Sequence, residues 1–348
     1  MHPLLLAKLW AWAVALPCAI AATTQANNPL NVKPAGPVGQ NASEAAQHDK
    51  LYPQSMSHQE QVKKLLQVSQ TQHQQALLRN LTSFPTRQYN SSSGSDAAKW
   101  LKGEMERIVA GNPRARISEF NHPWGQPSLI ATIAGKRPDT VILGAHFDSK
   151  ALPGLNAPGA NDNGSGVVAN LGALGVLADA QFDNENTIEV HLYAAEEFGK
   201  QGSDAVFTEY SKSNKSIVGM LQQDVVGHAP SRRVTVMKDF VDSALTKFVS
   251  AVAAAYTGSD PIETTCGSTC SDHFSASKQG FPAAYVEGDW DAEVESRVHT
   301  PGDTYETIDW EAIERHTKLA IGFLVEASYL NCNGCSWRTA KAKDPKRP

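Results

Sequence analysis

Five segments of the chain each carry an imidazole or carboxylate side chain at the end of an apolar stretch or in a nearby loop. They contain His146, Asp162, the adjacent pair Glu196 and Glu197, Asp224, and His299. Divalent metal ions such as zinc are bound in proteins by these two groups. A single histidine after an apolar stretch is more often an interior side chain than a ligand. Taken together, the five segments predict a metal site.

Glu196 and Glu197 place two neighbouring carboxylates at the end of an apolar segment. Successive residues of a strand point to opposite sides, so one carboxylate can bind metal while the other faces the substrate. A metal hydrolase needs both, because a carboxylate committed to a metal cannot also transfer a proton. The alternative interpretation is a solvated strand end without chemistry.

The segments that position these residues alternate between strand-like and helix-like patterns. We expect strands near 127–135, 140–146, 187–195, 216–222 and 282–286, and helices near 58–81, 96–110, 166–178, 203–212, 239–255 and 309–330. Asp309 is the expected N-cap of the last helix. The alternation predicts a single α/β domain with a mixed, largely parallel sheet covered by helices on both faces. In such sheets ligands bind beyond the carboxyl ends of the strands, where the carboxylates fall.

The two ends of the chain differ in composition from its middle. Residues 1–21 read as a secretory signal peptide, since the apolar run is interrupted by Lys8 and Pro17 and is short for a membrane span. Residues 22–56 show little apolar periodicity and are predicted to be a propeptide or disordered segment, although a simple linker is the alternative. The catalytic domain is expected over 57–331, followed by a tail over 332–348.

The cysteines and sequons agree with secretion. Cys18 lies in the predicted signal, which leaves the close pairs Cys266/Cys270 and Cys332/Cys335. Four cysteines can pair in three ways, and the spacing favours the one with two local disulfides, Cys266–Cys270 and Cys332–Cys335. Sequons occur at Asn41, Asn80, Asn90, Asn163 and Asn214. We expect Asn163 to stay unmodified, because a glycan beside Asp162 would block the predicted site.

Composition restricts the partners. Hydrophobic residues make up 41% of the chain and charged residues 19%, as in an ordinary globular protein. The formal net charge of -5 provides no broad basic field, so nucleic acid is not an expected partner. We also expect no stable membrane association and a monomeric protein.

Several motifs occur in a recognisable order: Gly144-Ala-His-Phe-Asp-Ser149, Ala157-Pro-Gly-Ala-Asn-Asp-Asn-Gly-Ser-Gly166, Ala194-Ala-Glu-Glu197, Gln223-Asp224, Cys266-Gly-Ser-Thr-Cys-Ser-Asp-His273 and His299-Thr300. This set closely resembles the secreted dizinc aminopeptidases of the bacterial and fungal leucine aminopeptidase type, over about 57–330.

The resemblance implies two zinc ions bridged by Asp162. His146 and Asp224 would complete one ion, and Glu197 and His299 the other. Glu196 would be the general base, and Asp148 would orient the imidazole of His146. The last role also follows from chemistry, because a carboxylate bound to the remote ring nitrogen fixes the tautomer and raises ligand basicity.

One position departs from the family. The short loop closed by the Cys266–Cys270 disulfide often carries a tyrosine that helps hold the tetrahedral intermediate, and here Ser268 matches it. A substrate pocket built from Val225, this loop, Phe281 and Tyr285 would suit an apolar first residue such as leucine. The alternative is that Phe281 and Tyr285 are ordinary core residues.

These observations predict an extracellular enzyme that hydrolyses the first bond of peptides with a free N-terminus. The competing hypotheses are a single-zinc glutaminyl cyclase with similar metal residues and a catalytically silent binding module on the same fold. The complete ligand set with an additional base argues against the silent module.

Overall fold

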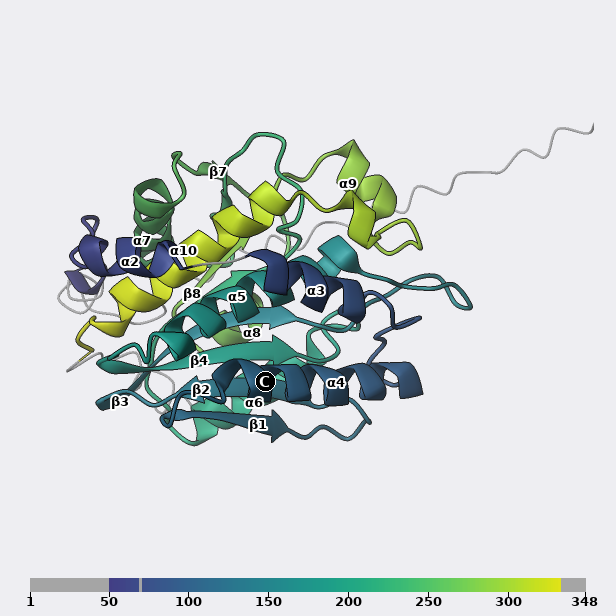
Figure 1. The fold of residues 1–348 in the computed structure, drawn as a ribbon, viewed down its shortest axis with the longest axis horizontal. Coiled ribbons are helices and arrows are strands. Elements are labelled where there is room, and N and C mark those ends of the chain that lie inside the picture. The colour runs from purple at the N-terminus through teal and green to yellow at the C-terminus, as the bar shows by residue number, and fades with distance from the viewer. Residues whose placement is uncertain (1–49, 69–70, 333–348) are drawn as a thin grey trace, which may run out of the picture. The chain divides into compact units, whose positions relative to one another are not determined.

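The computed structural model describes residues 50–68 and 71–332, which all belong to one compact unit. Its centre is an eight-stranded sheet with the order β1-β2-β4-β3-β5-β8-β6-β7 (Figure 1). The strands are β1 (Ala115–Phe120), β2 (Ser128–Ile133), β3 (Arg137–His146), β4 (Asn186–Tyr193), β5 (Ile217–Gln223), β6 (Thr235–Met237), β7 (Ile262–Thr264) and β8 (Ala283–Glu287).

The helices are distributed along the whole described chain. They are α2 (Gln59–Leu66), α3 (Thr71–Leu81), α4 (Ser92–Val109), α5 (Gly166–Asp179), α6 (Gln201–Lys212), α7 (Ser243–Tyr256), α8 (His273–Lys278), α9 (Ala292–Arg297) and α10 (Trp310–Ser328). Asp309 caps α10 as predicted, because its side chain accepts a hydrogen bond from the Glu311 N–H.

The four central strands β4, β3, β5 and β8 are parallel, whereas β1, β2 and β6 pair antiparallel to their inner neighbours. The predicted mixed, largely parallel sheet is therefore confirmed. The parallel strands are apolar on both faces because helices cover both sides. In β3, for example, every residue from Thr140 to His146 is buried.

Two layers of helices enclose the sheet. On one face α4, α5, α7 and α10 contact the strands, and α5 is packed against α3, α4 and α10 (Figure 1). This position explains why α5 is apolar nearly all round. On the other face α6 and α8 pack together, and Val206, Phe207 and Ala276 join a smaller core cluster with Ile142 and Met220.

Some elements differ from the prediction. The strand β1 was not expected, because it lies at the sheet edge and its sequence Ala-Arg-Ile-Ser-Glu-Phe neither alternates strictly nor contains an apolar run. The three-residue strands β6 and β7 and the short helices α8 and α9 are also too brief for a periodic signal. The expected helical region 58–81 divides into α2 and α3.

The chain before α2 packs onto the body of the protein. Tyr52 is buried, its hydroxyl donates to the Val218 carbonyl at 2.5 Å, and its ring lies beside Phe248. Glu326 accepts hydrogen bonds from the backbone N–H groups of Ser57 and His58. Residues 50–56 therefore belong to the folded body, which differs from the prediction of a disordered segment up to 56.

Other predictions concern residues that the structure does not describe. The signal peptide over 1–21, most of the segment 22–56, the Asn41 sequon and the tail after Cys332 lie outside the described residues. Cys332 is disulfide-bonded, and its predicted partner Cys335 belongs to that tail. Over the ranges 50–68 and 71–332, no helix is long and apolar enough to cross a membrane.

Candidate metal centre

Three neighbouring parallel strands bring the first ligand candidates together. His146 is the last residue of β3, Asp224 follows the last residue of β5, and Glu197 lies in the turn after β4. Because β3 pairs with both β4 and β5 in parallel, the carboxyl ends of all three strands meet at one edge of the sheet. This is the edge at which ligands bind in open α/β sheets.

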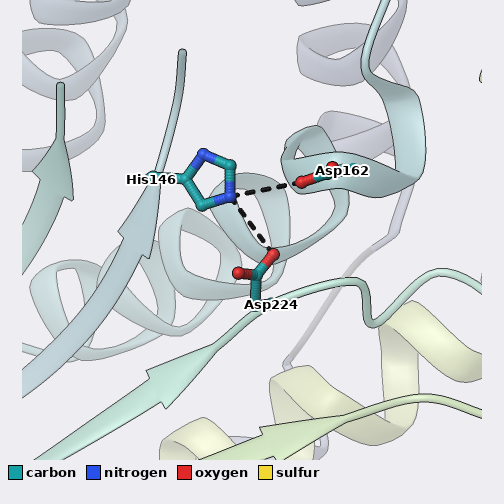
Figure 2. Close-up of side chains that lie close together, drawn as sticks. All are labelled: His146, Asp162 and Asp224. Atoms are coloured by element: carbon teal, nitrogen blue, oxygen red, sulfur yellow. Dashed lines mark ion pairs between the residues drawn. The ribbon is translucent and has the colours of Figure 1, made fainter. Parts of the chain in front are cut away.

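One group of candidate ligands surrounds His146 Nε2. This nitrogen lies 3.2 Å from Asp162 Oδ1 and 3.3 Å from Asp224 Oδ1, and all three side chains are buried (Figure 2). Two carboxylate oxygens so close to one imidazole nitrogen form a compact N and O donor set, the kind that zinc accepts.

A second group surrounds His299 Nε2. This nitrogen lies 2.8 Å from Glu197 Oε2 and 3.1 Å from Asp162 Oδ2. The two oxygens of Asp162 therefore face two different histidines, one in each group. A carboxylate in this position can bridge two cations.

The charges of the described ligand atoms fit metal binding. Burial raises the pKa of Glu197 to about 7, with Asp162 adding to the effect. Burial alone would also raise the pKa of Asp162, but hydrogen bonds from His146 and His299 hold it well below its usual range. Among the described residues, Asp224 Oδ1 and Glu197 Oε1 are buried without a hydrogen-bond partner. Such atoms are costly unless a cation satisfies them, so the residues present suit a metal pair.

Glu196 lies beside these groups but belongs to neither of them. Burial raises the pKa of Glu196 well above its usual value, and nearby Asp272 and Asp224 raise it further while His146 opposes them. Its backbone N–H and that of Glu197 donate to Asp148 Oδ1 and Oδ2 at 3.0 and 3.3 Å.

Asp148 thus holds the turn that carries both glutamates. Its Oδ1 also lies 3.4 Å from His146 Nδ1, which is an ionic contact without the geometry of a hydrogen bond. Asp148 therefore lies beside the remote ring nitrogen of His146, but without the hydrogen bond on which its expected orienting role depends, and it also binds the turn of Glu196 and Glu197.

The backbone is strained at three points around the site. Ala195, Val225 and His299 have positive φ angles of 56, 51 and 61°, in the left-handed region that non-glycine residues avoid. Each lies at or next to a candidate ligand or base. Such strain costs on the order of 1–3 kcal/mol per residue and concentrates at functional sites.

The loop that carries Asp162 is held from several directions. Asp303 accepts hydrogen bonds from the Asn161 and Asp162 N–H groups at 2.7 and 2.9 Å. The Asn163 side chain is buried and bonds the Gln223 carbonyl and the Gly166 N–H. The Asn163 amide thus has no access to solvent in the folded protein, whereas Asn80, Asn90 and Asn214 are exposed.

The predicted disulfide between Cys266 and Cys270 is present. Asp239 anchors its loop by accepting hydrogen bonds from the Cys266 and Gly267 N–H groups. Ser268 is exposed, and its hydroxyl lies 3.1 Å from Cys270 Sγ.

The predicted pocket residues lie in different surroundings. Val225 follows the candidate ligand Asp224 directly, and Tyr285 is buried and stacked on His273 with ring centroids 4.5 Å apart. The Tyr285 hydroxyl donates a hydrogen bond to Glu287 Oε1. Phe281 instead packs against Phe207 in the smaller core cluster, as the core alternative proposed.

Three residues around the site were not anticipated. Ser271 donates a 2.6 Å hydrogen bond to Asp224 Oδ2, Asp303 holds the Asp162 loop, and the buried Arg87 bonds carbonyls beside His146 and Asp162. Ser271 and Asp303 lie within or just after the recognised motifs, so the sequence gives a weak indication that they belong to the site. Arg87 lies far from any motif, and the sequence gives no such indication for it.

The chain is similar in sequence to known peptidases. The model of peptidase family M28 matches residues 128–324. Leucine aminopeptidase 1 of Aspergillus clavatus is 40% identical over 296 residues, covering 80% of this chain and 76% of that protein. Leucine aminopeptidase 1 of Blastomyces gilchristii is 42% identical over 268 residues, covering 72% and 70%.

A solved structure shares the same architecture. The Legionella pneumophila LapA aminopeptidase superimposes with a TM-score of 0.76 at 26% identity, covering 80% of this chain and 77% of that one. The family match covers more than half of the chain and includes the strands β2 to β8 and the loops that carry the candidate ligands. The chain therefore belongs to peptidase family M28 and is a zinc-dependent aminopeptidase.

Proposed function

We propose that this enzyme removes the first residue of peptides with a free α-amino group, that it prefers an apolar residue such as leucine, and that it acts outside the cell. Two zinc ions would be held by the two groups around His146 and His299. The observation that carries the proposal is that the two carboxylate oxygens of Asp162 face different histidines, at 3.2 and 3.1 Å.

In this proposal His146 and Asp224 would hold one ion, Glu197 and His299 would hold the other, and Asp162 would be shared by both groups. When bound, the zinc ions lower the pKa of a water molecule and polarise the scissile carbonyl. All further steps belong to side chains of the chain itself.

Glu196 is the proposed general base. It is held next to the ligand groups by the hydrogen bond from its own N–H to Asp148 and remains outside both groups, so its lone pairs stay free for a proton. It takes the proton of the attacking water and later returns it to the leaving amine. A positioned carboxylate of this kind contributes roughly 10²–10⁴-fold to the rate.

The carboxylates of the site also favour the free α-amino group. Together with the zinc ions, these carboxylates would hold the free α-amino group, which restricts attack to the first bond. Val225 and Tyr285 support an apolar side-chain pocket, and the names of the fungal relatives support leucine. Phe281 is not part of the proposed pocket.

Ser268 remains the point of departure from the resemblance. Its short hydroxyl reaches less far than a tyrosine would, so stabilisation of the oxyanion from this loop is expected to be weak.

The signal-like N-terminus, the sequons and the disulfide support action outside the cell. A monomer is the expected state.

The test combines metal analysis with a panel of substrates. The purified mature protein should contain two zinc ions per chain and release leucine from leucine amide much faster than aspartate or lysine from theirs, in a reaction that a chelator abolishes. Efficient release of charged residues would contradict the apolar pocket.

The same preparation separates the alternatives. One zinc per chain, with formation of pyroglutamate from a peptide that begins with glutamine, would replace the proposal by a glutaminyl cyclase. Purified protein that binds no metal and hydrolyses no amide would instead indicate a silent binding module.

A further inference from the structure

Arg87 is a fully buried arginine that lies between two of the segments carrying candidate ligands. Its Nε donates to the Phe147 carbonyl at 2.7 Å, and its Nη2 donates to the Gly159 carbonyl at 2.8 Å. Its Nη1 donates to the Pro158 carbonyl. One planar guanidinium therefore joins the end of β3, between His146 and Asp148, to the loop that leads into Asp162.

The position of Arg87 is itself fixed by its surroundings. Its backbone N–H donates to Ser149 Oγ at 3.0 Å, and its carbonyl accepts from Gln126 Nε2 at 2.9 Å. Ser149 in turn donates to the Ala157 carbonyl. The guanidinium is thus held from the strand side and the loop side at once, with little freedom to turn.

Gly159 shows how closely the loop approaches Arg87. This glycine has a φ of 54°, and a Cβ atom on it would lie 2.7 Å from Arg87 Nη2 and 2.5 Å from the Asp162 carbonyl oxygen. A side chain cannot fit in that space. Further along the loop, the Asp303 side chain accepts hydrogen bonds from the N–H groups of Asn161 and Asp162. The loop is therefore held through its carbonyls by Arg87 and through its N–H groups by Asp303.

Nearby carboxylates stabilise the positive charge of the buried Arg87. Burial lowers the pKa of Arg87 to about 10, while Asp303, Asp148, Asp162 and Glu197 raise it. The guanidinium hydrogen bonds are directed to carbonyls, which leaves the carboxylate oxygens of Asp162 and Glu197 available to the histidines. Arginine suits this task because its five donors lie in a rigid plane, which a lysine ammonium cannot reproduce.

We propose that Arg87 is a positioning residue of the metal centre, whose guanidinium fixes the separation between the His146 strand end and the Asp162 loop. This inference rests on the proposed function, because it concerns the metal ions that His146 and Asp162 would share. Contacts that orient ligands in this way are worth about 10–100-fold in metal affinity.

The test measures zinc affinity by competition with a chelator in the Arg87→Lys and Arg87→Gln variants. Arg87→Lys keeps a positive charge but loses the planar fork, and we expect its zinc affinity to fall by about 10–100-fold. Its kcat should fall at low zinc and recover as the zinc concentration is raised, with KM little changed. If Arg87→Gln does not fold, Arg87→Lys decides the question.

Arg114 provides a matched control. It is also an arginine on loop carbonyls, with Nη1 bonding the Ala134 carbonyl at 3.1 Å and Nη2 bonding the Gln181 carbonyl at 3.1 Å. Neither loop carries a candidate ligand. Arg114→Lys should therefore lower the melting temperature of the zinc-free protein without changing zinc affinity.

The outcomes separate a positioning role from general stabilisation. Wild-type zinc affinity in folded Arg87→Lys would overturn the inference, as would an equal loss of affinity in Arg114→Lys. A wild-type protein that binds fewer than two zinc ions would contradict the proposed function. The role of Arg87 would then be judged on whatever zinc the wild type binds, and equal affinity in the variant would still overturn it.

Discussion

Ser271 donates a 2.6 Å hydrogen bond to Asp224 Oδ2, which leaves Oδ1 of the same carboxylate facing His146. The hydroxyl and the carboxylate come from segments 47 residues apart, and both side chains are buried. The bond fixes which oxygen of Asp224 is available as a ligand. Ser271 directly follows Cys270 of the disulfide loop, so the hydrogen bond of Ser271 links this loop to the candidate ligand Asp224.

We therefore predict that Ser271→Ala weakens zinc binding by about tenfold, because the ligand carboxylate becomes free to rotate. Chelator competition on the purified variant measures the change. Ser213→Ala is the control, since its exposed hydroxyl only bonds carbonyls near the end of α6. Unchanged zinc affinity in Ser271→Ala would show that Asp224 is oriented by other contacts.

Glu196 and Glu197 are adjacent in the chain but differ in what they contact. Glu197 Oε2 lies 2.8 Å from His299 Nε2, whereas Glu196 belongs to neither ligand group. Glu196→Gln should keep both zinc ions and lose about 10²–10⁴-fold in kcat, because the general base is removed. Glu197→Gln should instead lose zinc.

The two variants control each other, since both replace one carboxylate by an amide in the same turn. Metal content by elemental mass spectrometry and kcat on leucine amide are the two measurements. Full turnover in Glu196→Gln would remove this residue from the mechanism, and full zinc content in Glu197→Gln would remove it from the ligands.

The sequence predicts well the features that depend on one segment at a time. The buried strands β3 and β5 are apolar runs that end in polar residues, and the apolar helix α5 is recognisable from its composition. Because parallel strands align their carboxyl ends, the strand pattern alone predicts that His146 and Asp224 lie at one edge of the sheet.

Features that depend on contacts between distant segments could not be predicted. Arg87 bonds Phe147 and Gly159, which lie 60 and 72 residues further along the chain. Nothing in the local sequence around Arg87 differs from an ordinary surface loop. The edge strand β1 could not be predicted for another reason, since its half-exposed residues show neither an apolar run nor a strict alternation.

Ser268 offers a test of the disulfide loop. In the resembling enzymes a tyrosine at this position helps hold the tetrahedral intermediate, and here the hydroxyl of the exposed Ser268 lies 3.1 Å from Cys270 Sγ. An oxyanion donor is worth about 10²–10³-fold in other enzymes. We predict that Ser268→Tyr raises kcat on leucine amide by about tenfold, as part of that stabilisation is gained.

Thr269→Tyr is the matched control, because it adds the same ring one position further along the loop. Steady-state kinetics on both variants provide the comparison. An unchanged or lower kcat in Ser268→Tyr would indicate that another group already stabilises the oxyanion.

Glu189 belongs to a buried hydrogen-bond network on β4. Its Oε2 accepts hydrogen bonds from His191 Nε2 at 3.0 Å and Tyr210 OH at 2.9 Å, and its Oε1 lies 2.6 Å from Lys215 Nζ. Burial raises the pKa of this carboxyl, but the contacts with His191 and Lys215 outweigh burial and lower it from 4.5 to about 2.

A carboxyl whose pKa is lower in the folded state stabilises the fold while it is ionised. The contribution is complete above the unfolded pKa of 4.5 and disappears as the pH falls from there to about 2. It amounts to at most about 3 kcal/mol. Glu189→Gln should therefore be less stable than wild type at pH 7, and its free energy of unfolding should fall less steeply between pH 4.5 and 2.

Urea unfolding of the zinc-free proteins at a series of pH values measures both effects. Glu60→Gln is the control, because Glu60 is 82% exposed and its pair with Lys63 at the surface contributes little. Parallel stability curves for wild type and Glu189→Gln below pH 5 would mean that the carboxyl is protonated at the same pH in the folded and unfolded states. In that case the Lys215 contact would provide no net stabilisation of the ionised form.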